Sequence, residues 1–99
     1  VTHTQTEGLD LLSCNVLLAS AELELGAVPG KELLLGRGLA DARQDYDFCV
    51  IDCPPSLGIL TLNALVASTD IIVPVQVHYY ALEGLKRLLE TIRVIRDRF

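Results

Sequence analysis

The stretch that most constrains this chain is YDFCVIDCPPS, residues 46–56. Four consecutive apolar residues precede Asp52, and such a run is typical of a strand that is buried on both faces. Pro54 and Pro55 follow the acid and cannot donate hydrogen bonds to a neighbouring strand, so the strand must end there. The sequence therefore predicts a buried strand over 46–53 that stops at a carboxylate.

Short apolar runs alternate with helical stripes along the rest of the chain. We predict strands over 9–15, 46–53 and 70–77, and helices over 16–26, 31–44, 57–68 and 81–99. Ser56 stands where it could cap the third helix. Each connection between strands is long enough to carry a helix, which favours parallel strands with right-handed crossovers and an α/β fold. Ligands of such sheets bind beyond the carboxyl ends of the strands, where Asp52 would lie.

Length and charge limit the classes of function. With 99 residues the chain is at most one domain, and no apolar run is long enough to span a bilayer. Residues 1–80 carry three basic and ten acidic side chains, whereas residues 81–99 carry five basic and three acidic ones. We interpret the basic residues of the last helix as a solvated face, because nucleic-acid binding needs a denser basic surface.

The cysteine pattern indicates a reducing environment. The three cysteines, Cys14, Cys49 and Cys53, form no disulfide framework and no zinc-ligand spacing. Two of them lie in or beside the apolar run, where cysteine behaves as a small hydrophobic residue. We expect buried, reduced thiols and a cytoplasmic protein.

Position alone leaves two interpretations of Asp52. In the first, the carboxylate is the polar residue at which an apolar strand reaches the surface. In the second, it is a metal-facing acid of the Walker B type, which holds Mg²⁺ or its water shell beside nucleotide phosphates. An apolar run followed by Asp is common by chance, so both interpretations stay open on these residues alone.

The wider sequence resembles a known family. The segments DCPPSLG, TLNAL and YYALEG, in this order, resemble the ParA/Soj chromosome and plasmid partitioning ATPases. These are deviant-Walker P-loop proteins related to MinD, and the resemblance extends over nearly the whole chain. It implies a partial P-loop NTPase-like fold, in which a parallel sheet is flanked by helices in three Rossmann-like layers. Residues 1–99 would then be the central part of one ATPase domain.

The resemblance also implies roles for individual residues. Asp52 corresponds to the Walker B aspartate near Mg²⁺, which it would contact through water. Pro54, Pro55 and Ser56 belong to the switch-like loop of region 46–56, which responds to the nucleotide. In the intact parent, ATP would drive dimerisation and non-specific DNA binding on the nucleoid, and a ParB-type protein would be the partner. No catalytic residue and no membrane contact are implied for this segment.

One element of an ATPase is missing from these residues. The phosphate-binding pattern G-x-x-x-x-G-K-[ST] does not occur, because the only Gly-Lys pair, Gly30-Lys31, is followed by Glu32. The chain begins at Val1 and contains no methionine, so we expect a piece of a longer protein. We expect this chain alone neither to bind nor to hydrolyse ATP, and we expect it to self-associate through uncovered apolar sheet faces.

Two alternatives remain at this stage. One is a fragment of a MinD-like cell-division-site ATPase, which a membrane-targeting amphipathic helix in the parent would indicate. The other is a non-catalytic α/β interaction module that only pairs with other chains, for which the missing phosphate-binding loop is suggestive.

Overall fold

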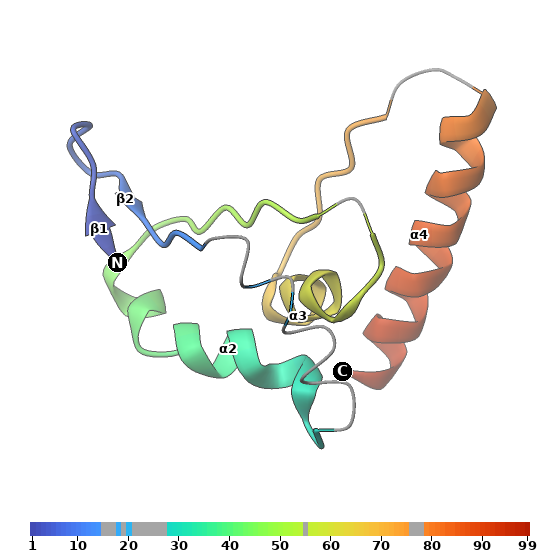
Figure 1. The fold of residues 1–99 in the computed structure, drawn as a ribbon, viewed down its shortest axis with the longest axis horizontal. Coiled ribbons are helices and arrows are strands. Elements are labelled where there is room, and N and C mark those ends of the chain that lie inside the picture. Colours follow the sequence, from blue (N-terminus) through green and yellow to red (C-terminus); the bar gives the residue numbers. More distant parts are fainter. Residues whose placement is uncertain (15–17, 19, 21–27, 55, 76–78) are drawn as a thin grey trace.

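The computed structural model describes residues 1–14, 18, 20, 28–54, 56–75 and 79–99. The named elements, in chain order, are β1 (Thr2–His3), β2 (Asp10–Leu11), η2 (Lys31–Leu33), α2 (Leu34–Leu39), η3 (Ala42–Asp45), α3 (Ile59–Ala67) and α4 (Tyr79–Arg98). Figure 1 shows α3 in the middle, with α2 beside it, α4 at one side and the β1–β2 hairpin at the opposite side. Most of the predicted helix over 16–26 lies outside the described residues.

The core of the described part is small and is built on α3. Five of its residues are buried: Ile59, Thr61, Asn63, Ala64 and Ala67. Helix α3 packs against η2 and α2, and it also touches α4. The sequence predicted this helix because the segment is apolar on nearly all sides, as helices buried on several faces are. That prediction is confirmed.

The start of α3 differs from the prediction. The helix begins at Ile59, and its N-cap is Gly58, whose backbone is extended and which makes no side-chain capping bond. Ser56 is therefore not the cap. A residue caps a helix through a side-chain oxygen near the amides of the first turn, and Ser56 stands two positions too early for this.

The predicted helix over 31–44 is confirmed, but it is divided into three pieces: η2, α2 and η3. Gly30 precedes the first piece in the left-handed region, with φ of 72°, a conformation that favours glycine. Gly36 of α2 lies against Ala67 of α3, since a Cβ atom at Gly36 would be 3.8 Å from the Ala67 Cβ. Small residues at this contact allow the two helices to approach closely.

The predicted buried strand over 46–53 is wrong for this chain. The backbone there is irregular, and Phe48 and Val50 are 88% and 93% exposed. The predicted strand over 70–77 is also wrong over 70–75, where Ile72 is 91% exposed, and its last residues lie outside the described part. A strand exists only when a neighbour completes its hydrogen bonds, and the described residues bring no neighbour to either run.

The sheet seen among the described residues is a two-stranded antiparallel hairpin, not the predicted parallel sheet. Thr2 pairs with Leu11, and His3 pairs with Asp10. The predicted strand over 9–15 is thus confirmed only at β2, and its partner β1 was not predicted as a strand. A short connection suits an antiparallel hairpin, whereas parallel strands need a long crossover.

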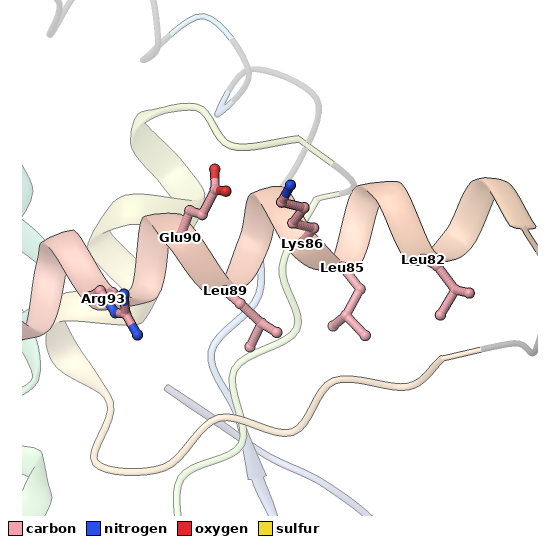
Figure 2. A pocket seen from close by; sticks show the side chains of 6 residues that line it. All are labelled: Leu82, Leu85, Lys86, Leu89, Glu90 and Arg93. Atoms are coloured by element: carbon pink, nitrogen blue, oxygen red, sulfur yellow. The ribbon is translucent and has the colours of Figure 1, made fainter.

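Helix α4 confirms the amphipathic helix predicted at 81–99. Leu82, Leu85 and Leu89 line a shallow groove along it, together with Lys86, Glu90 and Arg93 (Figure 2). Leu82 and Leu89 remain more than half exposed. Among the described residues, no helix is sufficiently long and apolar to cross a membrane.

Candidate functional site

Asp52 lies in the extended segment that leads from residue 46 toward α3, and its side chain is exposed. Pro54 and Ser56 are exposed as well, whereas Pro55 lies outside the described residues. The exposure of the carboxylate is compatible with both interpretations of Asp52. The predicted sheet edge at Asp52 is not found among the described residues, whose sheet is the β1–β2 hairpin.

The loop after Asp52 is fastened to α3 by one buried hydroxyl. Thr61 is 5% exposed, and its Oγ1 lies 2.5 Å from the Ser56 carbonyl oxygen and 3.4 Å from that of Pro54. The Ser56 amide in turn donates to the Pro54 carbonyl at 2.8 Å. The loop is thus held at Pro54 and Ser56, shortly before α3 begins at Ile59.

A second buried polar side chain holds the segment before the loop. The Asn63 side-chain oxygen accepts a hydrogen bond from the Leu35 amide at 3.0 Å. Its side-chain nitrogen donates to the carbonyls of Lys31 and Ile59 at 2.8 Å and 2.9 Å. One amide group therefore joins η2, α2 and α3.

Sequence reasoning missed both Thr61 and Asn63 as organising residues. The available signal was their polarity within LGILTLNALVAS, a segment otherwise made almost entirely of apolar and small residues. Because a buried polar group is costly without a hydrogen bond, polar residues in such a helix indicate specific partners. The identity of those partners depends on segments up to 32 residues away.

A third cluster lies apart from Asp52, where the hairpin meets residue 46. The Asp10 carboxylate is 2.6 Å from the His3 Nδ1, and it accepts a hydrogen bond of 2.6 Å from the Tyr46 hydroxyl. The hydrogen bonds from Tyr46 and then His3 lower the pKa of Asp10 below its ordinary value. The same bond to Asp10 raises the pKa of Tyr46.

The family model described as "AAA domain" matches residues 1–99, the whole chain. The chain belongs to this family. Its relatives narrow the assignment to the ParA/Soj-type partitioning ATPases, which confirms the resemblance found in the sequence.

Three relatives illustrate this AAA-domain subgroup. The Bacillus subtilis "Sporulation initiation inhibitor protein Soj" is 50% identical over 96 residues, which cover 97% of this chain and 38% of the relative. The Treponema pallidum "Chromosome-partitioning ATPase Soj" is 43% identical over 94 residues, covering 95% of this chain and 37% of the relative. The Myxococcus xanthus "Chromosome partitioning protein ParA" is 42% identical over 94 residues, which cover 95% of this chain and 33% of the relative.

The chain of this AAA-domain protein thus spans less than two fifths of the length of these curated relatives. No solved structure matches it. Membership in the family indicates an α/β NTPase-like fold, of which the described residues contribute helices and a small hairpin.

The three thiols of the AAA-domain chain are exposed, so the prediction of buried cysteines is wrong. It failed because the apolar run that contains Cys49 is not covered by other parts of the described chain. Cys53 is a partial exception: burial of its thiol group raises its pKa, and the neighbouring Asp52 carboxylate adds to the effect. The thiol also lies 3.9 Å from the Ile51 carbonyl oxygen.

Proposed function

We propose that this chain supplies the Mg²⁺-facing segment of an ATP-dependent partitioning protein, with Asp52 as its Walker B aspartate. The observation that carries the proposal is the exposed Asp52 carboxylate, followed within four residues by a loop fastened to a buried helix. A carboxylate on a loop with a fixed anchor can keep its position beside a metal while the rest of the loop responds to the nucleotide. The Treponema relative is named as an ATPase, which supports the same class of activity.

The donor groups fit Mg²⁺ only as part of a nucleotide complex. Among the described residues, no three His, Cys, Asp or Glu side chains gather into a metal-binding group. Mg²⁺ characteristically keeps several waters and takes one or two carboxylates together with phosphate oxygens. Asp52 can supply such a carboxylate through a water. When bound, Mg²⁺ would neutralise negative charge on the phosphates.

Pro54, Pro55 and Ser56 complete the proposed site as its nucleotide-responsive loop. Proline restricts φ and removes amide donors, so this loop cannot join a sheet and leaves the extended segment abruptly. Phosphate binding itself calls for backbone amides and a lysine of the G-x-x-x-x-G-K-[ST] type, which this sequence lacks. We therefore propose that other residues of the parent supply ATP binding, and that the chain alone binds no ATP.

The exposed apolar segments support a place inside a larger sheet. Phe48, Val50 and Ile72 are nearly fully exposed, although apolar runs of this type are characteristic of buried parallel strands. In the intact parent these segments would become strands of a parallel NTPase-like sheet. Left uncovered, they favour self-association of the 99-residue chain, which light scattering at micromolar concentration would detect.

The parent's remaining properties belong to the same proposal. The Soj and ParA relatives carry names that refer to chromosome partitioning, and we infer that the parent dimerises with ATP and binds DNA together with a ParB-type partner. Three acidic residues stand among the five basic residues of α4, so the basic residues do not by themselves form a dense nucleic-acid surface.

A chimera tests the proposal. The 96 matched residues of this chain would replace the corresponding segment of the Bacillus subtilis relative, with which they share 50% identity. We expect Mg²⁺-dependent ATP hydrolysis by the chimera, and we expect Asp52→Asn to reduce it by about a hundredfold, the usual size of losing one electrostatic contact to a reacting phosphate. Asp47→Asn is the matched control, because Asp47 is exposed in the same extended segment.

Two results would refute the proposal. One is equal activity of the Asp52→Asn and Asp47→Asn chimeras. The other is a folded but inactive unsubstituted chimera, which would instead favour a non-catalytic interaction module. Isothermal titration of the 99-residue chain with Mg-ATP completes the test, since saturable binding would contradict the proposal that other residues of the parent bind ATP.

A further inference from the structure

The hydroxyl of Thr61 faces two acceptors that both belong to the loop after Asp52. The nearer is the Ser56 carbonyl oxygen at 2.5 Å, and the other is the Pro54 carbonyl oxygen at 3.4 Å. A threonine hydroxyl has one proton, so it can donate to only one of these oxygens at a time. The shorter distance assigns the proton to Ser56 and leaves Pro54 as an alternative acceptor.

The surroundings of Thr61 make this bond consequential. The residue is 5% exposed, so water cannot readily replace a lost partner. Within a helix, a Ser or Thr hydroxyl commonly bonds to the carbonyl four residues earlier, as Thr91 of α4 does with Arg87 at 3.0 Å. Thr61 instead bonds outside its own helix. Its side chain is therefore committed to the loop and not to α3.

Thr61 and Asn63 contact different parts of the protein. Residues two apart on a helix do not share a face, and Asn63 accordingly bonds to residues 31 and 35 while Thr61 bonds to the loop. A substitution at Thr61 can thus release the loop without breaking the contacts of Asn63.

We propose that Thr61 is the positioning residue of the nucleotide-responsive loop, which it holds through the Ser56 carbonyl with Pro54 as a second anchor. The placement of the loop rests on the geometry above, whereas its effect on Mg-ATP rests on the proposed function of Asp52. Because Asp52 lies two residues before Pro54, releasing the anchor would free the carboxylate to leave its position.

Hydrogen exchange followed by NMR tests the anchor in the 99-residue chain, without nucleotide. The reporter is the Ser56 amide, which donates to the Pro54 carbonyl, and the reference is the Leu62 amide, which donates to Gly58 in the first turn of α3. We expect Thr61→Val to accelerate exchange at Ser56 about tenfold, the effect of losing one hydrogen bond of ordinary net strength. Exchange at Leu62 should remain within about twofold of its original rate, because the first-turn bond of the helix does not involve Thr61.

Two further variants define the control. Thr61→Ser keeps the hydroxyl and should retain slow exchange at Ser56. Thr91→Val removes a threonine hydroxyl that bonds within α4, and it should leave the Ser56 amide unchanged. Equal acceleration at Ser56 and Leu62 in Thr61→Val, or none at Ser56, would overturn the proposal, because Thr61 would then support the helix only or nothing.

The unsubstituted chain provides a measurement that does not depend on the folding of a variant. Its Ser56 amide should exchange at least about tenfold more slowly than the amide of Val50, which is 93% exposed. Equal exchange at the two positions would overturn the anchor. The two proposals can fail separately. If Asp52→Asn lowers the activity of the chimera but Thr61→Val leaves the exchange of Ser56 slow, the anchor fails and the proposed function stands. If Thr61→Val frees the loop but Asp52→Asn leaves the activity unchanged, the proposed function fails and the anchor stands.

Discussion

Substitution of Asn63 should destabilise the chain more than any other single change in a polar side chain of the described core. The side chain is 7% exposed and makes three hydrogen bonds that join η2, α2 and α3. Asn63→Ala removes all three at once. It takes the Asn63 side chain away from the Leu35 amide and from the Lys31 and Ile59 carbonyls.

The size of the effect follows from these contacts. An intramolecular hydrogen bond contributes about 1 kcal/mol net, so three bonds set an expected loss of about 3 kcal/mol in the free energy of unfolding. Leu35 and Lys31 are only half-buried, and water that reaches them can recover part of this loss. We therefore expect about 2–3 kcal/mol, a large fraction of the stability of a small domain.

Asn63→Asp is a sharper test, because it keeps the acceptor for the Leu35 amide but replaces the donor to the Lys31 carbonyl with a second acceptor. A carboxylate can still accept from the Leu35 amide, but it places negative charge at the position 2.8 Å from the Lys31 carbonyl oxygen. We expect a loss at pH 7 at least as large as that of Asn63→Ala. Protonation restores one donor, so the loss relative to the unsubstituted chain should be smaller at pH 4.

Urea denaturation followed by circular dichroism measures these effects. A loss of 2–3 kcal/mol corresponds to a shift of the midpoint by about 1–2 M for a protein of this size. Gln44→Ala is the matched control, because Gln44 is an exposed amide on η3 and should change stability by less than about 0.5 kcal/mol. The reasoning is refuted if Asn63→Ala matches that control, or if the penalty of Asn63→Asp is the same at both pH values.

Two further predictions concern the hairpin and the glycines. Because the pKa of Asp10 is lowered, its hydrogen bonds stabilise the hairpin fully above the ordinary value of 3.8 and are lost as the pH falls through the lowered pKa. Because the pKa of Tyr46 is raised, its bond to Asp10 is lost only as the pH rises through a pKa above 10.0. Tyr46→Phe should therefore remove a phenol that titrates above the ordinary value of 10.0 from the tyrosine absorbance titration, and a curve that keeps this phenol would contradict the assignment. Gly30→Ala should lower the free energy of unfolding by about 1–2 kcal/mol, because φ is 72° there. Gly38→Ala in α2 should raise it by about 0.5–1 kcal/mol, because an added Cβ atom meets nothing within 4 Å. Thermal denaturation compares the two, and the backbone argument is wrong if both have the same sign.

Sequence reasoning succeeded where structure is local. The segments 31–44, 57–68 and 81–99 contain helices as predicted, because a helix completes its hydrogen bonds within a few residues and its apolar stripe is visible in the sequence. The motifs DCPPSLG, TLNAL and YYALEG also identified the family without any coordinates.

The tertiary structure alone decided how these segments meet. The apolar run before Asp52 is exposed in this chain, because a strand requires a hydrogen-bonded neighbour that no local pattern can guarantee. The sequence showed Thr61 and Asn63 only as polar residues in an apolar helix. The bonds of Asn63 to Leu35 and Lys31 join segments 28 and 32 residues apart, whereas Thr61 bonds to Ser56, five residues before it. Local chemistry therefore determined the helices and the family, whereas the tertiary structure decided which carbonyls Thr61 holds and how Asn63 joins α3 to η2 and α2.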